Sequence, residues 1–213
     1  MELKNSRESL DSIHKKISLM SKNAIDSIEV VLGGVEIITG KRFEDDRGFF
    51  QESFNKISFA YNDLPGSFVQ DNHSRSKRGV IRGMHFQYMF GMGKLIRVVR
   101  GEILLVELDL RRGSPTFGKH VKIHLNDNEP KMVWIPSGFA NGFQVLSDVA
   151  DVCYKCDENR FHEKERSIRW DSFDCDWKDL GIDPILSEKD ANAISFDDWC
   201  ESDESRNREW YKV

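Results

Sequence analysis

Three polar side chains, Arg82, His85 and Gln87, lie in a run of residues that is otherwise apolar, GVIRGMHFQ at positions 79–87. A polar group buried in a protein interior costs free energy unless it forms hydrogen bonds or binds a ligand. The His side chain changes protonation near neutral pH, so it can act as a general base, and its neutral ring can bind a metal ion. Three interpretations of His85 are therefore open: a metal ligand, an acid–base catalyst, or a buried His satisfied by hydrogen bonds.

A metal site would need more imidazole groups than this region supplies. Gly79, five further residues and His85 match the start of the cupin metal motif, and PSGFAN at 136–141 matches its second half, P-x-G-x-x-H. A metal-binding cupin has another His two residues after the first and one at the end of the second half, where this chain has Gln87 and Asn141. Amides are poor ligands for a soft divalent ion. We therefore expect a barrel without a metal.

Further polar residues in or beside the apparent strands indicate a ligand of another kind. They are Arg47, Gln70, Asn72, Arg82, Lys94 and Tyr154. A barrel interior lined by cationic, amide and hydroxyl groups is costly unless it holds an anionic, hydroxyl-rich ligand.

Short, closely spaced strands must position these residues. From about Val30 the chain contains runs rich in Val, Ile and Phe that are bounded by Gly, Pro, Asn and Asp. Such runs, with no alternation of strand and helix, predict an all-β sandwich or barrel. Gly101 lies between IRVVR and EILLVELDL, where a tight turn would pair the two strands.

The two ends of the chain have different patterns. An apolar stripe at three- and four-residue steps predicts a helix within residues 9–28. The stripe consists of Leu10, Ile13, Ile17, Met20 and Ala24. We divide the chain into a helical extension, residues 1–29, and one domain, residues 30–213. After Trp170 the Asp-rich sequence predicts loops and short helices packed on the barrel, with mobile residues at 201–210.

Composition and charge argue against several classes of protein. Lys and Arg number 31 against 36 Asp and Glu, a net charge of −5, whereas chains that bind nucleic acid are usually strongly basic. No run reaches the roughly 18 consecutive apolar residues of a membrane-spanning helix. The amino terminus also lacks the apolar segment of a secretion signal. We expect no nucleic-acid or membrane partner, a cytoplasmic location, and four reduced cysteines.

A series of nine short motifs runs through residues 33–198. They are DDRGFFQE, QDNHS, GVIRGMHFQ, GKLIRVVRGEI, DLRRGSPTFG, IPSGFANGF, VLSD, YKC and LSEKDA. In order and spacing they resemble the dTDP-4-dehydrorhamnose 3,5-epimerase family of metal-free cupins. The resemblance implies a cupin-type jelly-roll barrel, a dTDP-linked sugar as substrate, no cofactor, and a homodimer in which strands cross between subunits.

The resemblance also implies roles for individual residues. His85 would be the general base and Asp190 its orienting partner, and Tyr154 would be the acid. Lys94 would lie near the developing enolate oxygen, with Arg82 beside it. The residues implied to bind the nucleotide sugar are Arg47, Phe50, Glu52, Gln70, Asn72, Ser74, Arg82 and Asn141.

Some positions depart from the family pattern. Asn141 replaces a His that the family usually has, and Arg160 stands where a second Tyr is common. Lys189 stands where an Arg often precedes the aspartate. Glu165, in the charged run EKER, is interpreted as a solvated residue, although the family has a glutamate near the nucleotide at this point.

The expected activity is epimerisation of a nucleotide-linked 4-keto-6-deoxyhexose, of the dTDP-4-dehydro-6-deoxyglucose 3,5-epimerase type. A base removes a proton next to the carbonyl, and an acid returns one from the opposite face. The alternatives are an epimerase acting at carbon 3 or carbon 5 alone, a ketoisomerase on another nucleotide sugar, and a non-catalytic cupin that binds a nucleotide sugar. A base backed by a carboxylate favours catalysis, because affinity alone does not require one.

Overall fold

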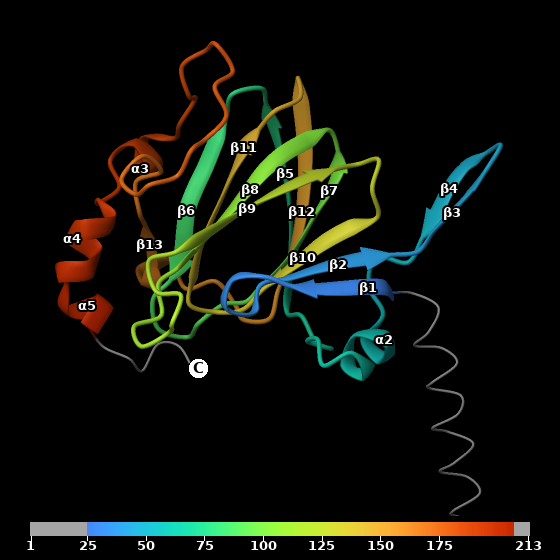
Figure 1. The fold of residues 1–213 in the computed structure, drawn as a ribbon, viewed down its shortest axis with the longest axis horizontal. Coiled ribbons are helices and arrows are strands. Elements are labelled where there is room, and N and C mark those ends of the chain that lie inside the picture. The colour runs from blue at the N-terminus through green and yellow to red at the C-terminus, as the bar shows by residue number, and fades with distance from the viewer. Residues whose placement is uncertain (1–24, 207–213) are drawn as a thin grey trace, which may run out of the picture.

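The computed structural model describes residues 25–206, which form β-strands with a few short helices (Figure 1). The strands are β1 Ile25–Val30, β2 Glu36–Gly40, β3 Arg42–Asp45, β4 Gly48–Gln51, β5 Gln70–Lys77, β6 Ile81–Gln87, β7 Lys94–Arg100, β8 Glu102–Asp109, β9 His120–Asn126, β10 Lys131–Ile135, β11 Phe139–Val145, β12 Val149–Cys156 and β13 Glu165–Ser167. The helices are η1 Leu32–Gly34, α2 Lys56–Tyr61, η2 His162–Lys164, α3 Glu188–Ala191, α4 Phe196–Glu201 and α5 Asp203–Arg206. No helix within residues 25–206 is long and apolar enough to cross a membrane.

Two antiparallel sheets face each other in a jelly roll. The six-stranded sheet has the order β1-β2-β10-β7-β12-β5, and the five-stranded sheet has the order β13-β6-β11-β8-β9. The strands β3 and β4 form a separate two-stranded sheet. The predicted all-β barrel is therefore confirmed.

The space between the sheets is apolar at one end and polar at the other. Alternate side chains of each strand point into this space. On β8, Ile103 and Leu105 belong to the buried core between the sheets, and the next residue on the same face is Glu107. On β12, Val152 belongs to the same core and Tyr154 follows it. Hydrophobic burial thus fixes the apolar halves of β8 and β12, and the polar residues follow at the other end of the space between the sheets.

Other segments of the chain cover part of the outer face of each sheet. Trp199 of α4 is fully buried against the five-stranded sheet, with its ring centroid 4.7 Å from that of Phe86. Phe59 of α2 packs with Met132 on the outer face of the six-stranded sheet. The covered strands, such as β6 and β10, are therefore packed on both faces.

The amino-terminal prediction needs correction where it overlaps the described residues. Residues 25–30 form β1, which pairs with β2 and places Ile28 opposite Ile38. The predicted helix is therefore wrong for residues 25–28, and the division at residue 29 falls inside a strand, because Ile25 and Ile28 pack on the core instead of extending a helical stripe. The stripe from Leu10 to Ala24 lies outside the described residues, and the rest of the domain division stays a prediction.

The turn at Gly101 does not form the predicted hairpin. β7 pairs with β10 and β12, whereas β8 pairs with β9 and β11. Gly101 has a φ of +79°, and a Cβ there would lie 2.1 Å from the carbonyl oxygen of Val149. This glycine therefore carries the chain from one sheet to the facing one.

The carboxyl-terminal segment is anchored as far as the structure describes it. Glu204 forms an ion pair with Arg166, with 2.5 Å between Oε1 and Nη2, and Ser205 is buried. The expected mobility is wrong for residues 201–206, and residues 207–210 lie outside the described residues. The predicted loops and short helices are otherwise present.

The β3–β4 hairpin projects from the body of the molecule (Figure 1). Three of its phenylalanines are exposed: Phe43 by 60%, Phe49 by 58% and Phe50 by 70%. Exposed aromatic side chains concentrated on one projecting element are typical of a contact surface.

Candidate active site

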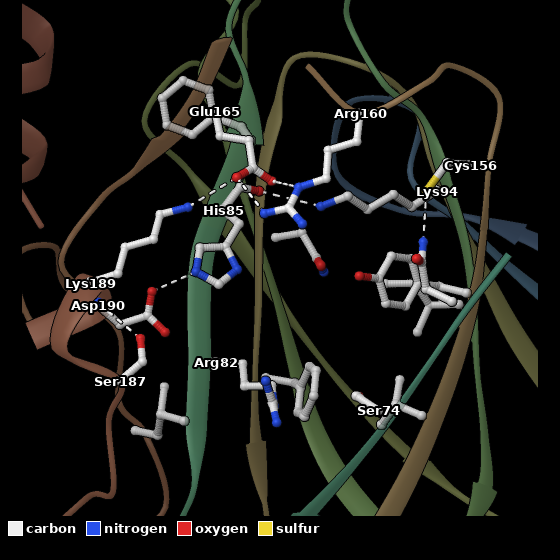
Figure 2. Close-up of a pocket in the computed structure, with 18 of the residues that line it drawn as sticks. Ser74, Arg82, His85, Lys94, Cys156, Arg160, Glu165, Ser187, Lys189 and Asp190 are labelled. Carbon is white, nitrogen blue, oxygen red and sulfur yellow. Dashed lines mark hydrogen bonds and ion pairs between the residues drawn. The ribbon is translucent and has the colours of Figure 1, made fainter. Parts of the chain in front are cut away.

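A cavity of about 450 Å³ occupies the polar end of the space between the sheets (Figure 2). β6 and β11 form one wall, and β5, β7 and β12 form the facing wall. The cavity brings together most of the predicted site residues. They are His85, Asp190, Tyr154, Lys94, Gln70, Asn72, Ser74, Arg82 and Asn141.

His85 and Asp190 form a close pair on the β6 wall. The His85 Nε2 lies 2.5 Å from Asp190 Oδ1, although the two residues are 105 positions apart in the chain. The Asp190 side chain is 3% exposed and that of His85 is 37% exposed. The carboxylate is therefore hidden behind the ring, and the ring faces the cavity.

The short helix α3 and its tether to β6 position Asp190. The Ser187 side chain caps α3 by accepting a hydrogen bond from the Asp190 backbone N–H at 3.1 Å. Ile185 exchanges hydrogen bonds with the start of β6: its N–H donates to Gly79, and its carbonyl accepts from Ile81. These contacts hold α3 against the strand that carries His85.

The pair also determines which nitrogen of His85 is basic. Burial alone would raise the pKa of Asp190, but hydrogen bonds from His85, Ser187 and the Gly83 backbone outweigh burial and lower it. An ionised carboxylate only accepts hydrogen bonds, so the proton on the ring lies on Nε2. Figure 2 shows the second ring nitrogen of His85, Nδ1, directed away from Asp190. Nδ1 therefore carries the lone pair that can accept a proton from a ligand.

Tyr154 lies on the facing wall. Its strand is paired on both sides, with Asn72 of β5 and Ile96 of β7 opposite Tyr154, so the backbone at this point is fixed. Burial raises the pKa of Tyr154, which keeps the hydroxyl protonated. The hydroxyl has no hydrogen-bond partner among residues 25–206, so it is free to donate to a ligand.

Lys94, at the start of β7, supplies a cation inside the cavity. Its Nζ lies 3.4 Å from the carbonyl oxygen of His85, which brings the Lys94 side chain to the strand β6 (Figure 2). Burial lowers the pKa of Lys94, and the charge of Glu107 is the largest opposing effect. A cation with little water around it interacts strongly with any negative charge that develops in the cavity.

Polar side chains of β5 and β6 line the rest of the cavity. Gln70 donates to Asn72 Oδ1 at 2.9 Å, and the Ser74 hydroxyl is buried without a hydrogen-bond partner among the described residues. The Arg82 Nε donates to Ser76 at 2.9 Å. Because Ser76 also lies on β5, this bond connects the two sheets at the edge of the cavity.

An ion-pair cluster crosses one side of the cavity (Figure 2). Arg160 binds both carboxylate oxygens of Glu165 at 2.7 Å, and Lys189 Nζ lies 3.3 Å from Glu165 Oε2. Burial would raise the pKa of Glu165, but the two cations lower it to about 2. The interpretation of Glu165 as a solvated residue is wrong, because the turn after β12 brings Arg160 back against β13.

Sequence analysis missed Glu107, which lies beneath Asn141. Glu107 is fully buried, and its Oε1 accepts a hydrogen bond from Asn141 Nδ2 at 2.5 Å. A signal was present: Glu107 is a charged residue in the apolar run EILLVELDL, the same kind of exception that identified His85.

Gln87, which stands at a ligand position of the metal cupins, binds backbone instead. Its Nε2 donates to the carbonyls of Phe90 at 2.6 Å and Asn159 at 3.2 Å, and its Oε1 accepts from the Phe161 N–H at 2.8 Å. Within residues 25–206, no three His, Cys, Asp or Glu side chains are grouped so that they could hold a metal ion.

Three predicted binding residues lie away from this cavity. Arg47 and Phe50 belong to the β3–β4 hairpin, and Glu52 follows β4 directly. Arg47 pairs with Asp45 of its own hairpin and is not among the residues that line the cavity. Within one chain, therefore, the predicted nucleotide site is split between the cavity and the hairpin.

The chain is similar in sequence to known proteins. A family model described as dTDP-4-dehydrorhamnose 3,5-epimerase matches residues 29–198. The chain is 49% identical over 159 residues to the dTDP-4-dehydrorhamnose 3,5-epimerase of Pseudomonas aeruginosa, covering 73% of this chain and 87% of the relative. It is 46% identical over 168 residues to that of Methanothermobacter thermautotrophicus, covering 78% and 91%.

Solved structures have the same fold. A dTDP-6-deoxy-D-glucose-3,5-epimerase from Legionella pneumophila, in complex with dTDP-4-keto-L-rhamnose, is 41% identical with a TM-score of 0.79 and covers 88% of this chain and 99% of its own. A 3'-monoepimerase from Streptomyces bikiniensis, in complex with dTDP-quinovose, is 29% identical with a TM-score of 0.75 and covers 79% and 87%. The similarity thus extends across the cavity and both sheets.

Proposed function

The chain belongs to the dTDP-4-dehydrorhamnose 3,5-epimerase family, and we propose that His85, oriented by Asp190, is its general base and Tyr154 the opposing acid. The chain is an isomerase, an epimerase of a nucleotide-linked 4-keto-6-deoxyhexose. One observation carries the assignment of roles: the His85–Asp190 pair and the Tyr154 hydroxyl lie on facing walls of one cavity. An epimerase needs a base and an acid on opposite faces of its substrate.

The proposed reaction moves only protons and electron pairs. The carbonyl at carbon 4 acidifies the hydrogens on carbons 3 and 5, and His85 Nδ1 takes one of them. The electrons of the broken C–H bond form an enolate whose negative charge lies on the carbon-4 oxygen, where Lys94 and Arg82 would stabilise it. Tyr154 then gives its proton to the same carbon from the other face. Exchange with solvent returns a proton to Tyr154 and removes one from His85, so no cofactor is consumed.

We propose that Gln70, Asn72, Ser74 and Asn141 bind the nucleotide sugar within the cavity, and that a second copy of the chain completes the site. Arg47, Phe50 and Glu52 are remote from the cavity of their own chain, and the hairpin that carries the first two exposes three phenylalanines. In a homodimer, the hairpin of each subunit would enter the cavity of the other. Arg47 would then supply a positive charge to the diphosphate, and Phe50 an apolar surface to the base.

Subunit complementation tests this assembly. His85→Asn and Arg47→Ala homodimers should each be nearly inactive. If the subunits share their sites, a refolded equimolar mixture regains activity, because a heterodimer holds one cavity with an intact base and an intact arginine. A mixture that stays inactive, although mass spectrometry shows heterodimers, would refute the shared site.

Hydrogen exchange tests the reaction itself. The protein is incubated in heavy water with dTDP-4-keto-6-deoxyglucose, and NMR follows each sugar position. We expect deuterium at carbons 3 and 5. Uptake at one carbon identifies a single-centre epimerase, and a shifted carbonyl identifies a ketoisomerase. Binding without any uptake identifies a non-catalytic cupin. A cytoplasmic location stays a prediction that cell fractionation tests.

A further inference from the structure

The β3–β4 hairpin is attached to the body of the molecule by polar contacts at its base. Phe43, Phe49 and Phe50 are each more than half exposed, so burial of these side chains does not fix the direction in which the hairpin projects (Figure 1). A two-stranded hairpin by itself is only marginally stable. The direction of this hairpin must therefore be set where it joins the body.

Arg42, the first residue of β3, makes the contacts at this junction. Its Nε donates to Gln51 Oε1 of β4 at 2.9 Å. The two terminal nitrogens bind the turn between β9 and β10: Nη1 donates to the Asn128 carbonyl at 2.8 Å, and Nη2 donates to the Asp127 carbonyl at 2.9 Å. The guanidinium also lies over the Phe49 ring, 4.0 Å from its centroid. One side chain thus joins both strands of the hairpin to a distant turn.

The turn that Arg42 binds is itself held in place. Asn126 Oδ1 accepts a hydrogen bond from the Asn128 backbone N–H at 2.9 Å, an arrangement that stabilises turns. Asp127 exchanges hydrogen bonds with Gly101: its N–H donates to the Gly101 carbonyl at 3.1 Å, and its Oδ2 accepts from the Gly101 N–H at 2.9 Å. Arg42 therefore binds the hairpin to the point where the chain passes from one sheet to the facing one.

The contacts of Arg42 use only one face of the hairpin. Successive residues of a strand point to opposite faces. Arg42 pairs with Gln51 in the register of the hairpin, and Phe49 is two residues from Gln51, so all three share one face. Phe43 and Phe50 pair with each other on the opposite face. Arg42 thus connects one face to the body and leaves Phe50 available on the other.

We propose that Arg42 is a positioning residue, which fixes the direction of the hairpin before two subunits meet and so places Arg47 and Phe50 in the cavity of the partner subunit. The proposal rests on the proposed function, in which each hairpin completes the site of the other subunit. A segment that is already held in its bound direction loses less conformational entropy when it docks. Arg42 would act on ligand binding in the partner's cavity without touching the nucleotide sugar.

Removal of Arg42 should change KM more than kcat, because the hairpin supplies binding groups and no acid–base group. We expect Arg42→Ala to raise KM for dTDP-4-keto-6-deoxyglucose about tenfold and to leave kcat within about twofold. Arg42→Lys keeps the charge but cannot form all three hydrogen bonds, so it should raise KM about threefold. This second variant covers the case in which Arg42→Ala does not fold or dimerise.

Arg169→Ala is the matched control. Arg169 is a partly exposed arginine that pairs with Asp171 and does not line the cavity. The substitution removes an arginine ion pair of similar exposure at a site remote from the hairpin, and it should leave both kcat and KM unchanged.

Mixed dimers test whether Arg42 acts across the subunit boundary. In the first heterodimer, one subunit carries Arg42→Ala and the other carries His85→Asn. Its one cavity with a base receives an intact hairpin, so the original KM should return. In the second heterodimer, one subunit carries both substitutions and the other is unchanged. Its one cavity with a base receives the altered hairpin, so KM should stay about tenfold raised. Different affinity tags on the two subunits allow each heterodimer to be isolated.

An original KM in folded, dimeric Arg42→Ala and Arg42→Lys would overturn the proposal. So would a KM that stays raised in the first heterodimer, because Arg42 would then act on the cavity of its own chain. Failure of the proposed function gives a different result. In that case the mixture of His85→Asn and Arg47→Ala subunits stays inactive although heterodimers form, whatever the effect of Arg42→Ala.

Discussion

The two walls of the cavity differ in how firmly they hold their polar side chains before a ligand binds. On the β6 wall, the proposed base is held before any ligand arrives: His85 binds a buried carboxylate, and that carboxylate is fixed by a helix cap and by the tether at Ile185. On the β12 wall, Tyr154 stands on a rigid strand, but its hydroxyl has no partner among the described residues. In the proposed mechanism, His85 is therefore oriented in the free chain, whereas Tyr154 would gain its hydrogen bond only from the substrate.

This difference separates two steps of the reaction. In the proposed mechanism, proton removal depends on the tautomer and orientation of the His85 ring, which Asp190 controls. Proton return depends on where the sugar presents its carbon to Tyr154. Changes on the β6 wall should therefore reduce exchange and inversion together, whereas changes on the β12 wall should affect inversion more.

The largest effect should follow removal of the base. We expect His85→Asn to reduce exchange and inversion together by about ten-thousandfold, the upper end of what one acid–base group contributes. Binding of dTDP, measured by calorimetry, should change little. His162→Asn, at an exposed His outside the cavity, is the control. Exchange at a comparable rate in His85→Asn would mean that another group is the base.

Tyr154→Phe should separate the two steps. The enolate should still form, and the His85 imidazolium should return the proton to the original face. Inversion is expected to fall roughly a hundredfold to ten-thousandfold, while solvent deuterium enters with retained configuration. Both rates can be followed by NMR on one sample, with Tyr61→Phe, at an exposed position of α2, as control. Equal losses would assign Tyr154 to enolate formation or sugar positioning, and unchanged rates would remove it from the role of acid.

Asp190→Asn should have a smaller effect on both steps. The amide introduced by this substitution can donate a hydrogen bond to Nε2 of His85, which favours the tautomer with its proton on Nδ1. The lone pair that faces the cavity is then lost. We expect exchange and inversion to fall together by about tenfold to a thousandfold. Asp183→Asn, in the exposed segment before α3, is the control. A loss of inversion without a loss of exchange would contradict the role assigned to Asp190.

Removal of metal should have no effect, which makes it the smallest of the expected changes. Neither wall has the imidazole set of a metal cupin, because Gln87 and Asn141 occupy two of its positions. Activity is measured before and after dialysis against a chelator, together with the metal content of the protein. Activity lost to the chelator and restored by one divalent metal would contradict this prediction.

The sequence identifies single residues of the site more readily than their partners. His85 is conspicuous because a titratable side chain interrupts an apolar run. Asp190 lies 105 positions away on a four-residue helix, and no local pattern connects the two. Only the resemblance to a known family joined them. The contact of Arg160 with Glu165 depends on an irregular turn. No periodic pattern in the sequence predicts such a contact.

Local sequence patterns also could not predict which of the two sheets each strand joins. A glycine between two apolar runs is typical of a hairpin, yet Gly101 connects strands in facing sheets. Which sheet a strand joins depends on contacts with distant segments, such as β12 for β7 and β11 for β8. The all-β class was predictable because it follows from composition and spacing, which are properties of the chain alone.

Gln87 has a structural role that another side chain could not easily take over. Its one amide links the loop after β6 to the loop after β12 through three backbone groups. A neutral imidazole has one donor and one acceptor, so Gln87→His could not replace all three bonds, and a metal would take its acceptor. Both loops would have to be anchored elsewhere before a metal ligand at this position could be tolerated. An engineer who wishes to convert this barrel into a metalloenzyme should therefore begin with the loops and introduce the ligands last.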